Sequence, residues 1–175
     1  MLFNTTGIYN VSVGSNALNA NTTGWYNTVL GSDAMYRNTT GIGNTSIGNA
    51  SLASNTTASY NVGVGYHSLY SNTTGFQNTA IGSNSLTSNT TGTSNTGIGL
   101  NSLYSNTTGG NNYAIGQSAL YSNLTSNANI AIGSVTLNKH TTGDGNIAIG
   151  HNALYTDISG VGNTAVGYNS LYSNT

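Results

Sequence analysis

A five-residue phrase, N-T-A-I-G, and its close variants recur along this chain every seventeen residues without insertion or deletion. An asparagine precedes the closing glycine of each phrase by four residues, and a leucine or methionine follows it by four residues. The glycines are Gly14, Gly31, Gly48, Gly65, Gly82, Gly99, Gly116, Gly133, Gly150 and Gly167. The asparagines are Asn10, Asn27, Asn44, Asn61, Asn78, Asn95, Asn112, Asn129, Asn146 and Asn163. Such strict spacing indicates that equivalent residues of successive repeats are neighbours in space, as in solenoid proteins.

The length of the repeat excludes helical solenoids, because a helix–turn–helix unit takes more than about 30 residues. The β-branched phrase T-A-I, flanked by Asn and Gly, predicts a short strand, and N-T-T-G predicts a turn. We therefore predict an all-β fold: a β-solenoid (β-roll) with one 17-residue coil per repeat, about ten coils spaced about 4.8 Å apart. Residues 1–175 form one repeat domain in this interpretation. Since neither end differs in composition, we expect a fragment of a longer fibre or the unit of a self-stacking filament.

The recurring side chains have predicted structural roles. The asparagine column is expected to form a ladder in which each side chain bonds its equivalents in the coils before and after. The threonine column from Thr6 to Thr142 is expected to stack hydroxyls in the same way, and each closing glycine to mark a corner without room for a Cβ. Ile81 and Leu86 represent the two large inward-facing residues expected in each coil. Since this core is thin for one chain, the apolar faces of several chains are expected to meet in a homo-oligomer, which we predict to be a trimer.

Composition excludes several partner classes. Only 3% of the residues are charged, and Arg37 and Lys139 are the only basic ones. Binding to nucleic acid or to an anionic membrane surface requires several basic side chains, so neither partner is expected. No segment approaches the ~18–20 apolar residues of a membrane span, and the absence of cysteine excludes disulfides and thiolate metal sites.

Candidate catalytic groups are few. The acids are Asp33, Asp144 and Asp157, and the histidines are His67, His140 and His151. No carboxylate recurs with the period, as it does in calcium-binding β-rolls, and no serine–histidine–acid set stands out. We therefore predict no enzymatic activity, no metal and no cofactor. His140 and Asp157 are interpreted as replacements of asparagine at surface positions of the S-N-T-T-G turn.

A column of tyrosines follows the recurring leucine in six coils and could contact the sugar rings of a cell-surface glycan by stacking and hydrogen bonding. The alternative is that these rings cover the leucine column or fill a seam between chains. The tyrosines are Tyr36, Tyr70, Tyr104, Tyr121, Tyr155 and Tyr172. N-T-T is also a formal N-glycosylation sequence, but a turn built of Asn and Thr produces it by accident. It begins, among other places, at Asn21, Asn38, Asn55, Asn72, Asn89 and Asn106.

The phrases N-T-A-I-G (78–82), N-I-A-I-G (146–150) and N-T-A-V-G (163–167) resemble the repeat of trimeric autotransporter adhesin heads. The longer unit N-T-A-I-G…S-L…S-N-T-T-G also resembles repeat regions of phage tail fibres. The resemblance covers essentially the whole chain and implies a left-handed β-roll in which three chains wind about one axis. It brings no catalytic residues, and the repeat here is longer than the usual adhesin-head repeat.

These observations lead to one preferred function and two alternatives. The preferred one is a structural and adhesive rod of an extracellular fibre, such as a phage tail-fibre shaft or a bacterial surface adhesin, that presents a receptor-binding tip. One alternative is an ice-binding solenoid that uses its repeated Thr columns. The other is a glycan-binding solenoid.

Overall fold

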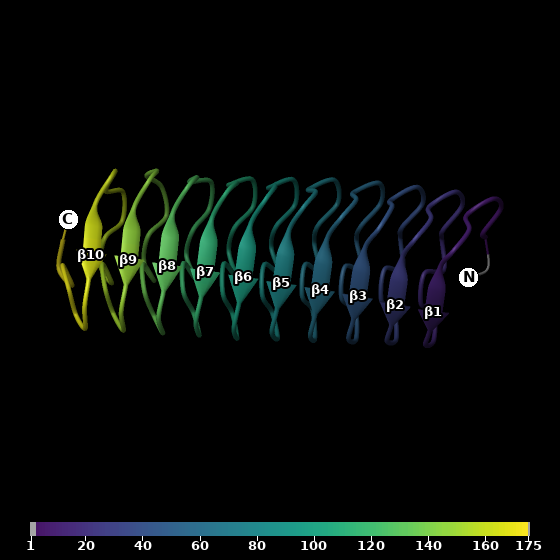
Figure 1. Cartoon of the computed structure of the whole chain (residues 1–175), viewed down its shortest axis with the longest axis horizontal. Coiled ribbons are helices and arrows are strands. Elements are labelled where there is room, and N and C mark those ends of the chain that lie inside the picture. Colours follow the sequence, from purple (N-terminus) through teal and green to yellow (C-terminus); the bar gives the residue numbers. More distant parts are fainter. Residues whose placement is uncertain (1–2, 175) are drawn as a thin grey trace.

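The computed structural model describes residues 3–174 as a continuous stack of coils with ten short strands and no helix. The strands lie side by side along the long axis of the molecule, and the two chain ends lie at opposite ends of it (Figure 1). They are β1 (Val11–Val13), β2 (Thr28–Leu30), β3 (Thr45–Ile47), β4 (Val62–Val64), β5 (Thr79–Ile81), β6 (Thr96–Ile98), β7 (Tyr113–Ile115), β8 (Ile130–Ile132), β9 (Ile147–Ile149) and β10 (Thr164–Val166).

Each strand pairs in parallel with the strands seventeen residues before and after it. In the pair β5–β6, Thr79 lies opposite Thr96 and Ile81 opposite Ile98. The same register holds from β1 to β10 in a single ten-stranded sheet. The prediction of an all-β solenoid with one coil per 17-residue repeat is therefore confirmed.

Coils also pair outside the strands. The backbone N–H of Leu86 donates to the carbonyl of Ser102 at 3.0 Å, and that of Thr90 donates to the carbonyl of Thr107 at 2.9 Å. Buried backbone groups must be paired, since an unpaired one costs free energy comparable to a lost hydrogen bond. Pairing with the next coil lets the turns satisfy this requirement although they form no sheet.

The interior differs from the expected one in which Ile and Leu both face inward. Leu86 is fully buried, but Ile81 is 40% exposed. The strand residue that faces inward is the middle one, Ala80, which is fully buried. Strand side chains alternate between faces, so a three-residue strand sends one side chain inward and two outward. The interior of a 17-residue coil is narrow, and the inward strand position accordingly holds Ala, Gly or Ser in every coil except that of Val29.

Tight corners close each coil. Gly82 has a φ of +129°, and a Cβ placed there would lie 2.6 Å from the carbonyl oxygen of Gly99. Four residues later, Leu86 has a φ of +52°, a left-handed conformation that is unusual for a bulky residue. The equivalent leucines share this conformation in every repeat, which turns the side chain into the interior, where its burial offsets the strain.

Candidate functional site

The asparagine before each strand is part of a continuous ladder. Oδ1 of Asn78 accepts hydrogen bonds from the backbone N–H and from Nδ2 of Asn95, at 3.0 and 3.2 Å. The backbone N–H of Asn78 donates in turn to Oδ1 of Asn61 at 2.9 Å. Nδ2 of Asn78 donates to the carbonyl of Gly92 at 2.8 Å. Asn78 thus joins three coils through its backbone N–H and its side chain, and neither polar atom of the side chain is unpaired.

A second asparagine ladder runs through the N-T-T-G turns, and the sequence reasoning did not assign it. Nδ2 of Asn72 donates to Oδ1 of Asn55 at 3.2 Å and to the carbonyl of Gly75 at 2.9 Å. Its members are fully buried: Asn21, Asn38, Asn55, Asn72, Asn89, Asn106 and Asn123. The recurrence of asparagine every seventeen residues from 21 to 123 could have predicted this ladder. It was not predicted because the turn was expected to be exposed to solvent. Because these amides are buried and bonded, they are not accessible for glycosylation in the folded chain.

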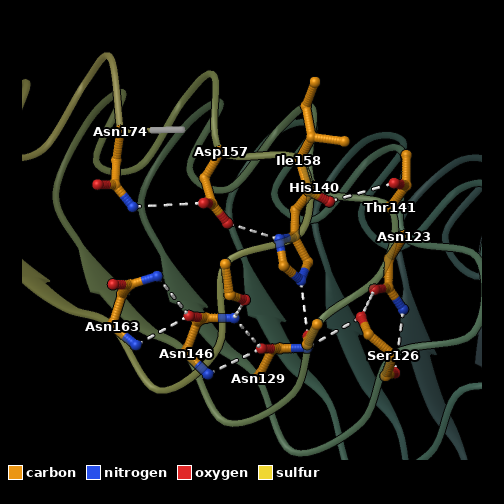
Figure 2. A network of polar contacts seen from close by, with 12 residues as sticks. Asn123, Ser126, Asn129, His140, Thr141, Asn146, Asp157, Ile158, Asn163 and Asn174 are labelled. Atoms are coloured by element: carbon orange, nitrogen blue, oxygen red, sulfur yellow. Dashed lines mark hydrogen bonds and ion pairs between the residues drawn. The ribbon is translucent and has the colours of Figure 1, made fainter.

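His140 and Asp157 occupy the column of the second ladder in the next two coils, and their interpretation as surface positions is wrong. Both side chains are fully buried, with His140 Nδ1 2.8 Å from Asp157 Oδ2 (Figure 2). Nε2 of His140 lies 2.8 Å from the carbonyl of Gly143. Since a carbonyl only accepts, Nε2 carries a proton, and one further proton lies between Nδ1 and Oδ2. Asn174 donates to the other carboxylate oxygen of Asp157 at 3.4 Å. On the side of the preceding coil, Oδ1 of Asn123 accepts from the hydroxyl of Ser126 rather than from His140, so His140, Asp157 and Asn174 form a separate set in the same column.

The threonines of the turn divide into two roles. The hydroxyl of the first one, such as Thr39, donates to the carbonyl of the corresponding threonine in the next coil, here Thr56, at 3.0 Å. The expected column of stacked hydroxyls from Thr6 to Thr142 is instead an exposed file on the outside of the turn. The reason is that the first threonine, rather than the second, lies beside the carbonyl of the next coil.

The tyrosine column lies on the surface with its rings in coil-to-coil contact where tyrosines are adjacent. Tyr104 and Tyr121 stack with their centroids 5.1 Å apart, and Tyr155 and Tyr172 do the same at 5.1 Å. Tyr36 is separated from Tyr70 by a coil without a tyrosine. The structure therefore places two stacked pairs and two single tyrosines along one line.

One column on the outer face of the sheet is apolar along its whole length. The last residue of every strand is Val, Leu or Ile and points away from the interior. Several of these side chains are exposed by more than a third: Val13, Leu30, Ile81, Ile115, Ile132, Ile149 and Val166. Exposed apolar patches of this extent are typical of interaction surfaces.

The remaining titratable groups do not assemble into a catalytic set. Asp144 accepts a hydrogen bond from the backbone N–H of Asn127 at 2.7 Å, and His151 stacks on Tyr168. Within residues 3–174, no three His, Cys, Asp or Glu side chains are grouped so that they could hold a metal ion. That part of the chain also contains no helix long and apolar enough to cross a membrane.

Comparisons with protein-family models, with curated proteins and with solved structures found no match to this chain.

Proposed function

We propose that the chain is the structural and adhesive rod of an extracellular fibre, in which three copies pack their strand faces together around a common axis. The observation that supports this most is the outward apolar column at the end of every strand. A side chain such as Ile115, 39% exposed in the single chain, gains burial free energy when another chain covers it, at about 25 cal/mol per Å². The column repeats in every coil, so the gain repeats along the rod.

The interior supports the same proposal. Nine of the ten coils bury a leucine or methionine, from Leu18 to Leu154. The inward strand residue is small in every coil except that of Val29, and the last residue of each strand, Val, Leu or Ile, lies outside. A chain that turns its β-branched residues outward along a continuous file is best stabilised by an identical file on a second and third copy. The resemblance to adhesin heads adds the expectation that the coil is left-handed and the assembly trimeric.

The properties of the single coil stack also suit a rod. Neighbouring coils are bonded by strand pairs and by the asparagine ladder before the strands, and from Asn21 to Asn123 also by the second buried asparagine ladder. Few charges and continuous pairing favour a stiff and protease-resistant spacer.

Light scattering of the purified chain tests the assembly. A mass near three times 17.8 kDa is expected. A variant that combines Ile81→Thr, Ile98→Thr and Ile115→Thr should fold, because threonine suits a strand, but should have the mass of one chain. A combined Leu124→Thr and Ile158→Thr variant is the control: it removes exposed apolar side chains from the turn, where threonine is the usual residue, and should remain trimeric. A wild-type monomer, or a strand-face variant of unchanged mass, would contradict the proposal.

Ice binding is a second candidate, favoured by the exposed file of second threonines. The file consists of Thr6, Thr23, Thr40, Thr57, Thr74, Thr91, Thr108, Thr125 and Thr142. It is one residue wide, because the neighbouring threonines use their hydroxyls between coils. A thermal hysteresis measurement at high protein concentration decides this candidate, and absence of hysteresis removes it.

A further inference from the structure

The tyrosine column contains a gap one ring wide. Where tyrosines occupy adjacent coils, their centroids are 5.1 Å apart. Tyrosines of alternate coils are therefore separated by about 10 Å, enough for one ring between them. Tyr36 and Tyr70 are such a pair, and the residue between them in the column is Ala53. A cavity of about 320 Å³ lies at this place, lined by these three residues together with Asp33, Arg37 and His67.

At the other interruptions of the column, a polar side chain is hydrogen-bonded to the preceding coil. At the position of Ala53, the coil after Tyr70 has Thr87, whose hydroxyl donates to the carbonyl of His67 at 3.0 Å. The coil after Tyr121 has Asn138, whose amide donates to the carbonyl of Ser118 at 3.0 Å. Ala53 has no polar group to make the corresponding bond to the carbonyl of Asp33. The gap at Ala53 is thus open, and a carbonyl acceptor lies beside it.

The cavity also gathers charge in a chain that has very little. Two of the five charged residues, Asp33 and Arg37, line it, with one of the three histidines. Within the described residues the only ion pair is His140–Asp157, so Asp33 and Arg37 do not neutralise one another by direct contact. The Asp33 carboxylate accepts bonds from Asn16 at 3.0 Å and from Ser32 at 3.2 Å. Since a carboxylate has about four lone-pair sites, it can accept further donors.

One wall of the cavity is aromatic. The ring of His67 is stacked on Tyr66 with centroids 3.8 Å apart and lies 4.6 Å from the ring of Tyr70. His67 and Tyr70 both line the cavity, so two members of this row of three rings form part of its wall. A preformed wall lowers the entropy lost when a ligand binds.

We propose that this cavity, the slot between Tyr36 and Tyr70, binds a single neutral pyranose ring of a glycan. The ring takes the place in the column that a tyrosine would occupy in the coil of Ala53. Its C–H faces pack against Tyr36 and Tyr70, while its hydroxyls donate to Asp33 and accept from Arg37. Aromatic walls with a few placed polar groups are the usual composition of small-ligand sites, and the volume lies at the lower end of their range of ~300–1,000 Å³.

The charge of the slot favours a neutral sugar over an acidic one. Asp33 and Arg37 contribute opposite charges, so with His67 neutral the slot has no net charge. A ligand carboxylate would gain from Arg37 but would be repelled by Asp33. Hydroxyl groups satisfy both side chains at once, because a hydroxyl is both a donor and an acceptor. A flat apolar ring would fill the slot but would offer no acceptor to Arg37 and no donor to Asp33 beyond Asn16 and Ser32.

Methyl-resolved NMR of the full chain, labelled with ¹³C at alanine methyls, tests the proposal at the site itself. The probes are the methyl glycosides of glucose, galactose and mannose, with glucuronic acid and indole for comparison. At least one neutral glycoside should shift the Ala53 methyl signal in a saturable way, with a dissociation constant in the millimolar range. Glucuronic acid and indole should bind at least about tenfold more weakly.

A variant that fills the slot with a tyrosine ring tests whether the sugar binds there. Ala53→Tyr introduces the residue that other coils carry at this position, so it should fold and should stack between Tyr36 and Tyr70. It should abolish saturable binding, observed on the neighbouring Ala50 methyl. Thr87→Tyr fills the next interruption of the same column and should leave binding to the slot within about twofold of the wild type.

Three results would overturn the proposal: no saturable shift with any neutral glycoside, binding that persists in Ala53→Tyr, or tighter binding of indole or glucuronic acid than of every neutral glycoside. The proposal concerns the turn of residues 49–54 rather than the strand face, so it does not rest on trimer formation. Light scattering of the same NMR sample distinguishes the two proposals. A monomeric chain whose Ala53 signal still shifts with a neutral glycoside would contradict the trimer but not the sugar site.

Discussion

His140 Nδ1 lies 2.8 Å from Asp157 Oδ2 in the same column that asparagine side chains occupy in the preceding coils from Asn21 to Asn123. In those coils each amide donates to its equivalent in the preceding coil, as Asn89 does to Asn72 at 2.9 Å. The imidazole and the carboxylate keep the same coil-to-coil spacing with different chemistry. Because His140 and Asp157 bond to one another, we expect a change of one to require a change of the other.

This coupling predicts the effect of breaking the pair. Asp157→Ala leaves Nδ1 of buried His140 without its partner, and should destabilise the chain by about 1–3 kcal/mol, the usual cost of an unsatisfied buried polar group. The double variant His140→Asn with Asp157→Asn restores the repeat and should recover most of the loss. Thermal unfolding followed by circular dichroism measures both. Asp144→Asn, which changes the same charge at an exposed site, should have little effect, and a double variant as unstable as Asp157→Ala would contradict the coupling.

The corner glycines predict a second effect. Gly82→Ala places a Cβ 2.6 Å from the carbonyl oxygen of Gly99, at a φ of +129°. The next coil must shift, so the melting temperature should fall sharply and amide protection around Gly99 should drop. Gly167→Ala is the matched control, because its φ is +125° but nothing lies within 4 Å of the added Cβ. Equal losses in the two variants would show that backbone strain, rather than contact between coils, sets the requirement for glycine.

The ladder beside the strands predicts a third effect. Asn78→Ala removes the acceptor of the Asn95 backbone N–H and the donor to the carbonyl of Gly92. The buried backbone N–H of Asn95 then lacks a partner, whereas the carbonyl of Gly92 keeps its bond from Nδ2 of Asn89. A loss of about 1–3 kcal/mol is expected for one unsatisfied buried group. Asn49→Ala removes an exposed amide whose one bond, to the carbonyl of Ser32, is 3.4 Å long. The free energy of unfolding of that control should lie within about 0.5 kcal/mol of the wild-type value. If Asn78→Ala is as stable as the control, the ladder is not a source of stability.

The inward and outward strand positions predict a fourth effect. Ala131→Leu forces a large side chain into the narrow interior and should cost about 1–3 kcal/mol or more through overpacking. Ile132→Leu, one residue further, alters only the outer face, where Ile132 is partly exposed. Denaturant unfolding compares the two variants. If Ala131→Leu lowers the free energy of unfolding less than Ile132→Leu does, the inward and outward faces of the strand are assigned wrongly.

The sequence was sufficient to predict the coil, the strand positions and the tight corners, because each depends on which residue recurs at a fixed interval. Glycine, for example, closes all ten phrases. The structure explains why at Gly82, where a Cβ would lie too close to the carbonyl oxygen of Gly99. The direction of the strand side chains could not be predicted in the same way. In a three-residue strand, alternation is compatible with either Ala80 or Ile81 inside, and only the narrow width of the interior decides between them.

Two other features were beyond sequence reasoning for a different reason. Leu86 adopts a left-handed conformation that propensities assign to Gly, Asn or Asp, so its burial overrides its local preference. The slot at Ala53 depends on what lies one coil before and one coil after it, and on side chains such as Thr87 that are hydrogen-bonded at the equivalent positions. The tyrosine column itself could be read from the sequence, but its one open interruption could not.

The hydrogen bonds between coils run along the long axis of the molecule, from each strand to the next (Figure 1). Tension applied between the two ends therefore acts on successive coil-to-coil interfaces in series, and each interface carries the full force through all of its bonds at once. In such a nearest-neighbour stack, the mechanical strength is set by the weakest interface rather than by the number of coils. Lengthening the chain by whole repeats would extend its reach without lowering the force at which a typical interface opens.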